Sequence, residues 1–196
     1  TVPTIVSVTR DPSFLDPSNL ATVAFRVEFS ERVVGLSAAA LQLSTTGSLT
    51  GTIGTPTNVV FPNPNDPLNG RVATVPVTGI TGVGTMGLTA KAASGITDNA
   101  TNALSLTPAP SPNEVFTIDR VGPTILSIVR APVQPAPGPT NAALVNWTVT
   151  FDEPATGVSA AKFTLRNEGT LVGTTPTVTG SGAIYNVAAA TGTNGV

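Results

Sequence analysis

The chain has 196 residues and a net charge of −2, and only 10% of its residues are charged against 40% that are hydrophobic. That balance gives no basic surface for nucleic acid or anionic lipid, and no apolar run reaches the ~20 residues of a transmembrane helix. The lack of Cys and His excludes disulfides, thiol nucleophiles, zinc–thiolate sites and triads with a histidine base.

The first elements along the chain are short β-strands separated by segments rich in Pro, Gly, Asn and Asp. Residues 23–29 alternate apolar Val and Phe with Ala, Arg and Glu, and this period of two predicts a strand with one buried face. Similar patterns predict strands at 4–9, 40–44, 50–53, 72–78, 84–90 and 114–118. Pro76 lies inside one of them, which indicates an edge strand or a bulge. Only residues 37–41 suggest helix, and for a single turn.

The second part of the chain repeats the first. The segment VPTIVSVTR begins at Val2 and its near-copy GPTILSIVR at Gly122, 120 residues later. The segment VEFSERVVGLSAAALQL begins at Val27 and its near-copy VTFDEPATGVSAAKFTL at Val149, 122 residues later. Two matches at nearly the same spacing indicate a repeated domain the size of an immunoglobulin-like sandwich, ~100 residues plus loops.

These patterns predict an all-β fold of two tandem immunoglobulin-like β-sandwiches, domain 1 over 1–119 and domain 2 over 120–196. Domain 2 is expected to be incomplete, because the second copy lacks counterparts of roughly the last two strands of the first. Two explanations are open. The natural chain continues beyond this sequence, or a neighbouring chain supplies the missing strand.

Three segments resemble the bacterial Ig-like repeats of large cell-surface proteins, adhesins and surface-layer proteins: VEFSERVVGLSAAALQL, GITDNATNAL and FTIDRVGPTI. Those repeats carry a strand ending in F-x-E-x-V, a late D-x-x-G-N loop and an Asp-x-x-x-Pro junction to the next copy. Thr101 departs from the pattern, since it stands where the family often has Gly. The resemblance implies a spacer, an adhesion stalk or a surface-layer module.

Acidic and amide side chains are expected to gather at the ends of the sandwiches. Alternate strand ends of an antiparallel sandwich share a pole, which places Glu31, Asp98 and Asn102 at the pole where the chain enters domain 1. Asp119 would face Glu153 across the junction between the domains. Ca²⁺ takes 6–8 oxygen ligands, so these five residues form a hypothetical pair of calcium sites. The alternative is that the glutamates cap loops and that the late loop is an Asx turn.

The sequence favours a non-catalytic structural module of a long extracellular protein at the bacterial cell surface. Its expected partners are neighbouring repeats, identical subunits or other surface components. No pair of carboxylates is placed to hydrolyse a glycoside, so we expect no enzyme activity. A carbohydrate-binding accessory module is the alternative, and exposed aromatic residues would favour it. Trp147 is expected in the core, whereas Phe14 and Phe61 lie in loops as anchors or contact points.

Overall fold

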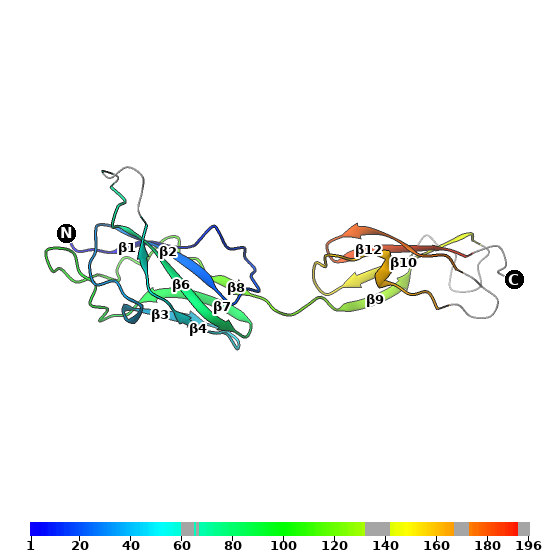
Figure 1. The fold of residues 1–196 in the computed structure, drawn as a ribbon, viewed down its shortest axis with the longest axis horizontal. Coiled ribbons are helices and arrows are strands. Elements are labelled where there is room, and N and C mark those ends of the chain that lie inside the picture. The colour runs from blue at the N-terminus through cyan, green and yellow to red at the C-terminus, as the bar shows by residue number, and fades with distance from the viewer. Residues whose placement is uncertain (60–64, 66, 132–141, 167–172, 192–196) are drawn as a thin grey trace. The chain divides into compact units, whose positions relative to one another are not determined.

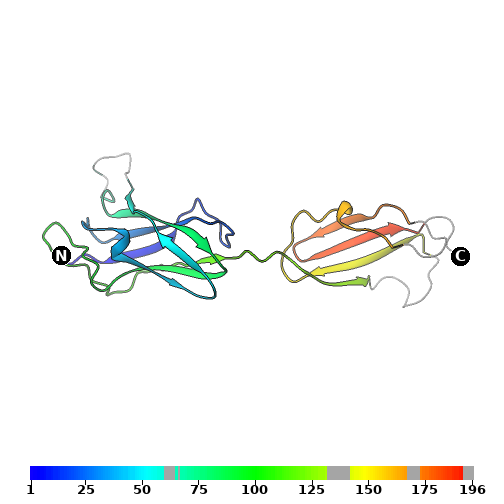
Figure 2. The same cartoon turned by 60° about the horizontal axis from the view of Figure 1, so that its bottom comes forward.

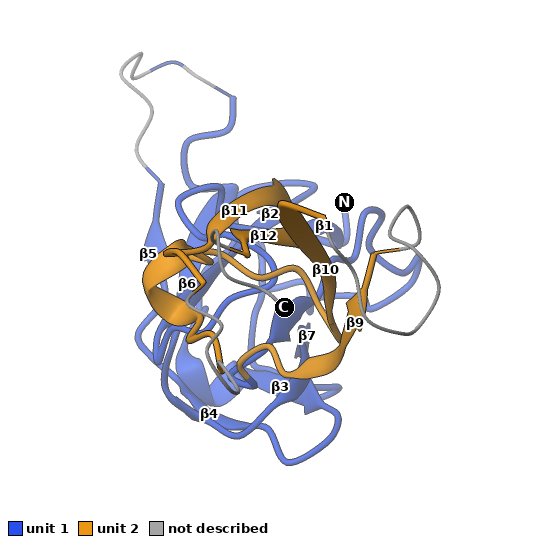
Figure 3. Cartoon of the chain, turned by 90° about the vertical axis from the view of Figure 1, so that its right-hand side faces the viewer, with its two compact units in different colours: residues 1–121 blue, residues 122–196 orange. Residues whose placement is uncertain are grey.

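A computed structural model describes residues 1–59, 65, 67–131, 142–166 and 173–191. The chain forms two compact units, unit 1 from Thr1 to Val121 and unit 2 from Gly122 to Val196, coloured separately in Figure 3. The regular secondary structure of the described residues is almost entirely β-strand, with two short 3-10 turns. Among these residues, no helix has the length and apolar character needed to cross a bilayer.

The larger sheet of unit 1 has five antiparallel strands (Figure 1). Its order is β1 (Ile5–Arg10), β2 (Val23–Phe29), β6 (Val72–Thr81) and β4 (Thr50–Ile53), with the short β5 (Thr57–Asn58) also paired with β6. The strands β1 and β2 shift register between Ile5 and Ser7. The apolar face predicted for residues 23–29 is buried in this sheet.

The smaller sheet of unit 1 has the order β3 (Leu41–Thr45), β7 (Gly84–Ala90) and β8 (Phe116–Ile118). A single 3-10 turn, η1 (Ala38–Ala40), leads into β3, as the short helical signal predicts. Side chains of both sheets interdigitate in one core, in which Phe25 and Phe116 meet edge to face with ring centroids 5.2 Å apart. The prediction of a β-sandwich is therefore confirmed.

Pro76 lies in a central strand, so the edge-strand alternative is wrong. The strand does carry an irregularity in its pairing with β4, where the register shifts between Thr50 and Thr52. Pro76 pairs with Ala24 of β2 on one side, and its carbonyl accepts a hydrogen bond of 2.8 Å from Gly54 on the other. The N–H and C=O of one strand residue point the same way. The missing N–H of Pro76 therefore faces the gap where β4 ends and β5 has not begun, and no ladder bond is lost there.

The first strand of unit 1 is also bonded along its outer edge. Residues 105–114 run parallel to β1, with bridges from Thr4 to Ser105 and from Val8 to Asn113. Four backbone hydrogen bonds of 2.8–2.9 Å join the two segments: Ser105 N to Pro3 O, Ser111 N to Val6 O, Val8 N to Pro112 O and Glu114 N to Val8 O. We call this set of bonds the β1 clamp.

Unit 2 has one four-stranded antiparallel sheet among its described residues. The order is β11 (Thr177–Ser181), β12 (Ile184–Ala190), β10 (Leu144–Phe151) and β9 (Ile125–Arg130), so β9 lies at the margin of the sheet (Figures 1 and 2). A 3-10 turn, η2 (Ala160–Lys162), follows β10 as η1 follows β2. A small hydrophobic core around Val149 packs on one face of this sheet. The hydroxyl of Tyr185 donates a hydrogen bond of 2.7 Å to the carbonyl of Ala155.

The strand register of unit 2 reproduces that of the larger sheet in unit 1. In unit 1, Val8 pairs with Val27, and Val27 pairs with Ala73. In the same way, Ile128 of unit 2 pairs with Val149, and Val149 pairs with Tyr185. The irregularity near the start of β1 recurs at the start of β9. In this comparison β9, β10 and β12 are the counterparts of β1, β2 and β6.

Candidate functional site

The residue just after the second strand caps the first strand in both units. In unit 1 the hydroxyl of Ser30 accepts a 2.9 Å hydrogen bond from the backbone N–H of Thr4, and the Ser30 N–H donates to the Thr4 carbonyl at 2.9 Å. In unit 2 the Asp152 carboxylate accepts bonds from the N–H (2.8 Å) and hydroxyl (2.5 Å) of Thr124, and the Asp152 N–H donates back at 3.1 Å. The shared structural role therefore belongs to Ser30 and Asp152, one residue before the repeated glutamate.

Glu31 reaches the late loop of unit 1 through Thr1. The Thr1 hydroxyl donates a 2.6 Å hydrogen bond to Oε1 of Glu31, and the Thr1 carbonyl accepts a 3.4 Å bond from Nδ2 of Asn102. Glu31, Asp98 and Asn102 are thus linked at one end of unit 1. Sequence reasoning did not identify Thr1, because an isolated threonine in a chain rich in threonine carries no signal.

Asp98 and Asn102 close the late loop of unit 1 on itself. The carboxylate of Asp98, only 5% exposed, accepts 2.8 Å bonds from both the backbone N–H and the side-chain Nδ2 of Asn102. The Asp98 N–H donates to the Asn102 carbonyl at 3.1 Å. These contacts make the loop a self-capped turn, as the loop-capping alternative expects.

The tight loop forces Thr101 into a left-handed backbone conformation, with φ of 68°. This is the position where the resembling repeats often have Gly. A β-branched side chain in that region costs ~1–2 kcal/mol, and the greater freedom of an unfolded glycine offsets part of the gain from replacing it. We expect Thr101→Gly to raise the free energy of unfolding by about 0.5–1 kcal/mol in urea denaturation. Ala100→Gly, which relieves no positive φ, is the control and should bring no gain.

Two carboxylates have lowered pKa values. The side-chain hydrogen bond from Asn102 is the main cause for Asp98, and the side-chain bond from Thr124 is the main cause for Asp152. Burial opposes both shifts, more weakly. The charged form of each carboxylate is therefore favoured in the folded chain.

Acid is expected to weaken both loops. A folded pKa below the ordinary value of 3.8 means that the carboxylate stabilises the fold fully above that pH. The contribution is lost as the pH falls from about 3.8 through the lower folded pKa. Asp98→Asn should therefore lower the melting temperature at pH 7, and the gap from the parent chain should narrow below pH 4. A gap that stayed constant down to pH 2 would contradict the assigned role.

The remaining predicted calcium ligands are Asp119 and Glu153, which belong to different units. Asp119 makes a local turn, in which Oδ1 accepts a 3.0 Å bond from the N–H of Val121. In the part of the chain that the structure describes, no three His, Cys, Asp or Glu residues are grouped as metal ligands. The Asp98 oxygens already face N–H donors, whereas Ca²⁺ needs 6–8 oxygen ligands. Both calcium sites stay predictions.

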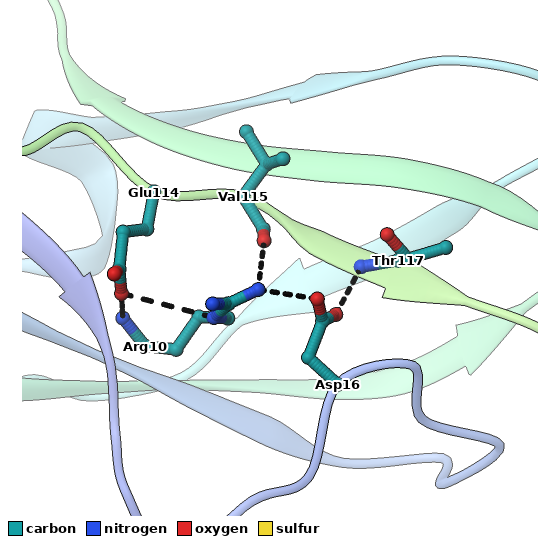
Figure 4. A network of polar contacts seen from close by, with 5 residues as sticks. All are labelled: Arg10, Asp16, Glu114, Val115 and Thr117. Carbon is teal, nitrogen blue, oxygen red and sulfur yellow. Dashed lines mark hydrogen bonds and ion pairs between the residues drawn. The ribbon is translucent and has the colours of Figure 1, made fainter.

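A polar network at the other end of β1 was not expected from the sequence (Figure 4). The guanidinium of Arg10 contacts the Asp16 carboxylate and donates a 3.2 Å bond to the Val115 carbonyl, while the Arg10 N–H donates to Oε2 of Glu114 at 2.8 Å. Asp16 also accepts a 2.6 Å bond from the N–H of Thr117. The network joins β1, the following loop and β8. The network holds these backbone segments together, and we assign it no catalytic or binding role.

The aromatic residues give little support to carbohydrate binding. Phe14 packs against the core, edge to face with Phe116 at 6.4 Å, so it is a loop anchor. Phe61 lies outside the described residues, and no described aromatic side chain is exposed. A depression of about 190 Å³ lies between β1, β7 and the Pro-rich residues 106–113. No charged side chain lines it, and it is smaller than the ~300 Å³ of typical ligand pockets.

No protein-family model and no curated protein matches the chain. Among solved structures it is similar to the Escherichia coli adhesin FdeC, with 14% identity and a TM-score of 0.36 over 95% of this chain and 55% of that chain. It is also similar to domains 4–9 of the surface layer protein SbsC, with 11% identity and a TM-score of 0.27 over 99% of this chain and 28% of that chain. The chain thus spans about half of the first structure and less of the second, and likenesses this low carry no functional argument.

Proposed function

We propose that the chain is a non-catalytic, load-bearing module of an extracellular bacterial surface protein, acting as a spacer or stalk between neighbouring repeats. Its motifs resemble bacterial Ig-like repeats, and the low content of charged residues suits a surface that makes few strong contacts. The observation that carries the proposal is the β1 clamp of unit 1.

The β1 clamp is oriented to resist pulling along the chain. The strand β1 begins unit 1 and residues 105–114 lead into its last strand, and the two segments run parallel. Force applied at the two ends of unit 1 therefore loads the four backbone bonds in shear, so that they must break together rather than one after another. The Arg10 network adds the bond to Glu114 and the ion pair with Asp16 at the end of the same clamp.

Single-molecule pulling of the 196-residue chain tests this role. Unit 1 is expected to unfold in one step that releases about 40 nm of chain, since an extended residue spans ~3.5 Å. Val8→Pro removes the N–H that donates to Pro112 and should strongly lower the rupture force. Glu114→Ala, which leaves the core intact, should weaken the clamp more mildly at the Arg10 end.

Val27→Ala is the matched control for Val8→Pro. Val27 and Val8 are equally buried, at 1% exposure, but Val27 makes no bond of the β1 clamp. Both variants should lower thermal stability, whereas only Val8→Pro should greatly lower the force. An equal loss of force in both variants, or stepwise unfolding of the parent unit at low force, would refute a load-bearing role.

A further inference from the structure

Unit 2 leaves open a face that unit 1 covers. Ile125 is 51% exposed where its counterpart Ile5 is 6% exposed, and Ile128 is 53% exposed where Val8 is 1% exposed. In unit 1 these positions lie under β7 and the Pro-rich segment after it. Among the described residues of unit 2, no second sheet faces β9.

The exposed part of this face lies at its β9 edge, since Ile128 pairs directly with Val149 and the two side chains share one face. The rest of the same face is covered, because Ala155, Val158 and Phe163 from the loop after β10 pack around Val149 and Val187. Trp147 occupies the position of Phe25, which is fully buried in unit 1, yet Trp147 is only half-buried. The side chain of Trp147 therefore lies on the core face of the sheet, as predicted, but it is not fully buried.

At Ile128 the outer edge of β9 also has no backbone partner among the described residues. Ala131 N–H donates to the Asn146 carbonyl at 3.0 Å, as Asp11 donates to Ala24 in unit 1. The backbone N–H and C=O groups of alternate residues in a strand point to opposite neighbours. Those of Val129 and Ser127 therefore point toward β10, and those of Ile128 point away from it. Val8, the counterpart of Ile128, is bonded there on both its N–H and its carbonyl by residues 105–114. No described residue makes these bonds to Ile128.

We propose that the β9 face of unit 2 is an acceptor site for a polypeptide segment with the chemistry of residues 84–118 of unit 1. The occupant has two parts. A Pro-rich extended stretch runs parallel to β9 and bonds the N–H and carbonyl of Ile128, and two antiparallel strands lay apolar side chains over Ile125, Ile128 and Trp147. The site accepts a strand by main-chain pairing and selects it by alternating apolar residues.

Unit 1 defines what the occupant must carry. Residues of β7 and β8 that point into the core of unit 1 are Met86, Leu88, Ala90, Phe116 and Ile118, all at most 2% exposed. They alternate with more polar residues such as Thr85 and Thr117, which pair across the two strands. This acceptor site on unit 2 is separate from the load-bearing role, which rests on the β1 clamp of unit 1.

The test is to extend the full 196-residue chain, through a flexible Gly/Ser linker after Val196, by a second copy of residues 84–119. Trp147 is the only tryptophan of the chain and reports on the face directly. Its emission should move to shorter wavelength and lose its acrylamide quenching. The amide of Ile128 should exchange about tenfold more slowly, as expected for a gained backbone hydrogen bond.

The control extension carries serine in place of the copied Met86, Leu88, Phe116 and Ile118, and should leave Trp147 and Ile128 unchanged. Equal responses to both extensions, or no response to either, would overturn the proposal. So would sedimentation showing that the unextended chain dimerises with Trp147 already buried, because the occupant would then be a second copy of the same face. The pulling behaviour of unit 1 is independent of all these outcomes.

Discussion

Replacing Phe116 by alanine is expected to lower the free energy of unfolding of unit 1 by about 3–5 kcal/mol. Phe116 is fully buried and lies edge to face with both Phe25 and Phe14, at 5.2 and 6.4 Å. Its ring joins the smaller sheet to the larger one, so its loss leaves a cavity between the sheets that neither sheet alone can close. Urea denaturation followed at amides of β2 and β6 measures the effect.

Val115→Ala is the control for this prediction. Val115 is the adjacent residue but is 44% exposed, so its truncation should cost less than about 0.5 kcal/mol. If Phe116→Ala and Val115→Ala were equally mild, the two sheets of unit 1 would not share the core described here.

Gly82→Ala is expected to destabilise unit 1 by about 2–4 kcal/mol. Gly82 lies in the turn between β6 and β7 with φ of 78°, which costs a side chain ~1–2 kcal/mol. A Cβ at this position would also lie 2.2 Å from the Ser48 carbonyl oxygen, and that backbone atom cannot move aside as a flexible side chain can. Thermal and urea denaturation both measure the loss.

Gly79→Ala separates the two causes of this loss. Gly79 also has a positive φ, of 60°, but a Cβ there would meet nothing within 4 Å. It should therefore cost only the conformational part, ~1–2 kcal/mol. Equal costs at Gly79 and Gly82 would show that the close approach of the Ser48 backbone does not constrain the turn.

Periodicity predicted the strands of unit 1 well because the longer of them, such as β2 and β7, bury one face in the core. The ranges 23–29, 50–53 and 84–90 coincide with β2, β4 and β7. The two-residue β5 is too short to show a period, and its pairing depends on β6. Residues 105–114 were not recognised as an edge partner of β1, because prolines interrupt any alternation and the pairing is parallel.

The location of the candidate site could be predicted from the sequence, but its hydrogen bonds could not. Strand alternation alone places Glu31 and the late loop at one end of unit 1, where Thr1 links them. The sequence drew attention to the repeated glutamate, but the repeated contact is made by Ser30 and Asp152, whose side chains differ. A shared role for two different residue types appears only when the backbone positions are known.

The exposed face of unit 2 also could not be located from the sequence. The sequence predicts strands of one type in both units, yet it does not show which of the shared positions are covered. Comparison of Ile128 with Val8, at 53% and 1% exposure, locates the effect on β9. Residues 163–166 follow η2 as β3 follows η1, but they form no strand, because no described counterpart of β7 is there to pair with them.

One sheet design occurs twice in this chain, covered over its first strand in unit 1 and exposed there in unit 2. Amide hydrogen exchange on the 196-residue chain tests this difference most directly at Val8, Ile128 and Val149. The amides of Val8 and Val149 should exchange slowly, because each donates within a bonded ladder, whereas that of Ile128 should exchange rapidly. Protection of Ile128 equal to that of Val8, or rapid exchange of Val149, would contradict this account.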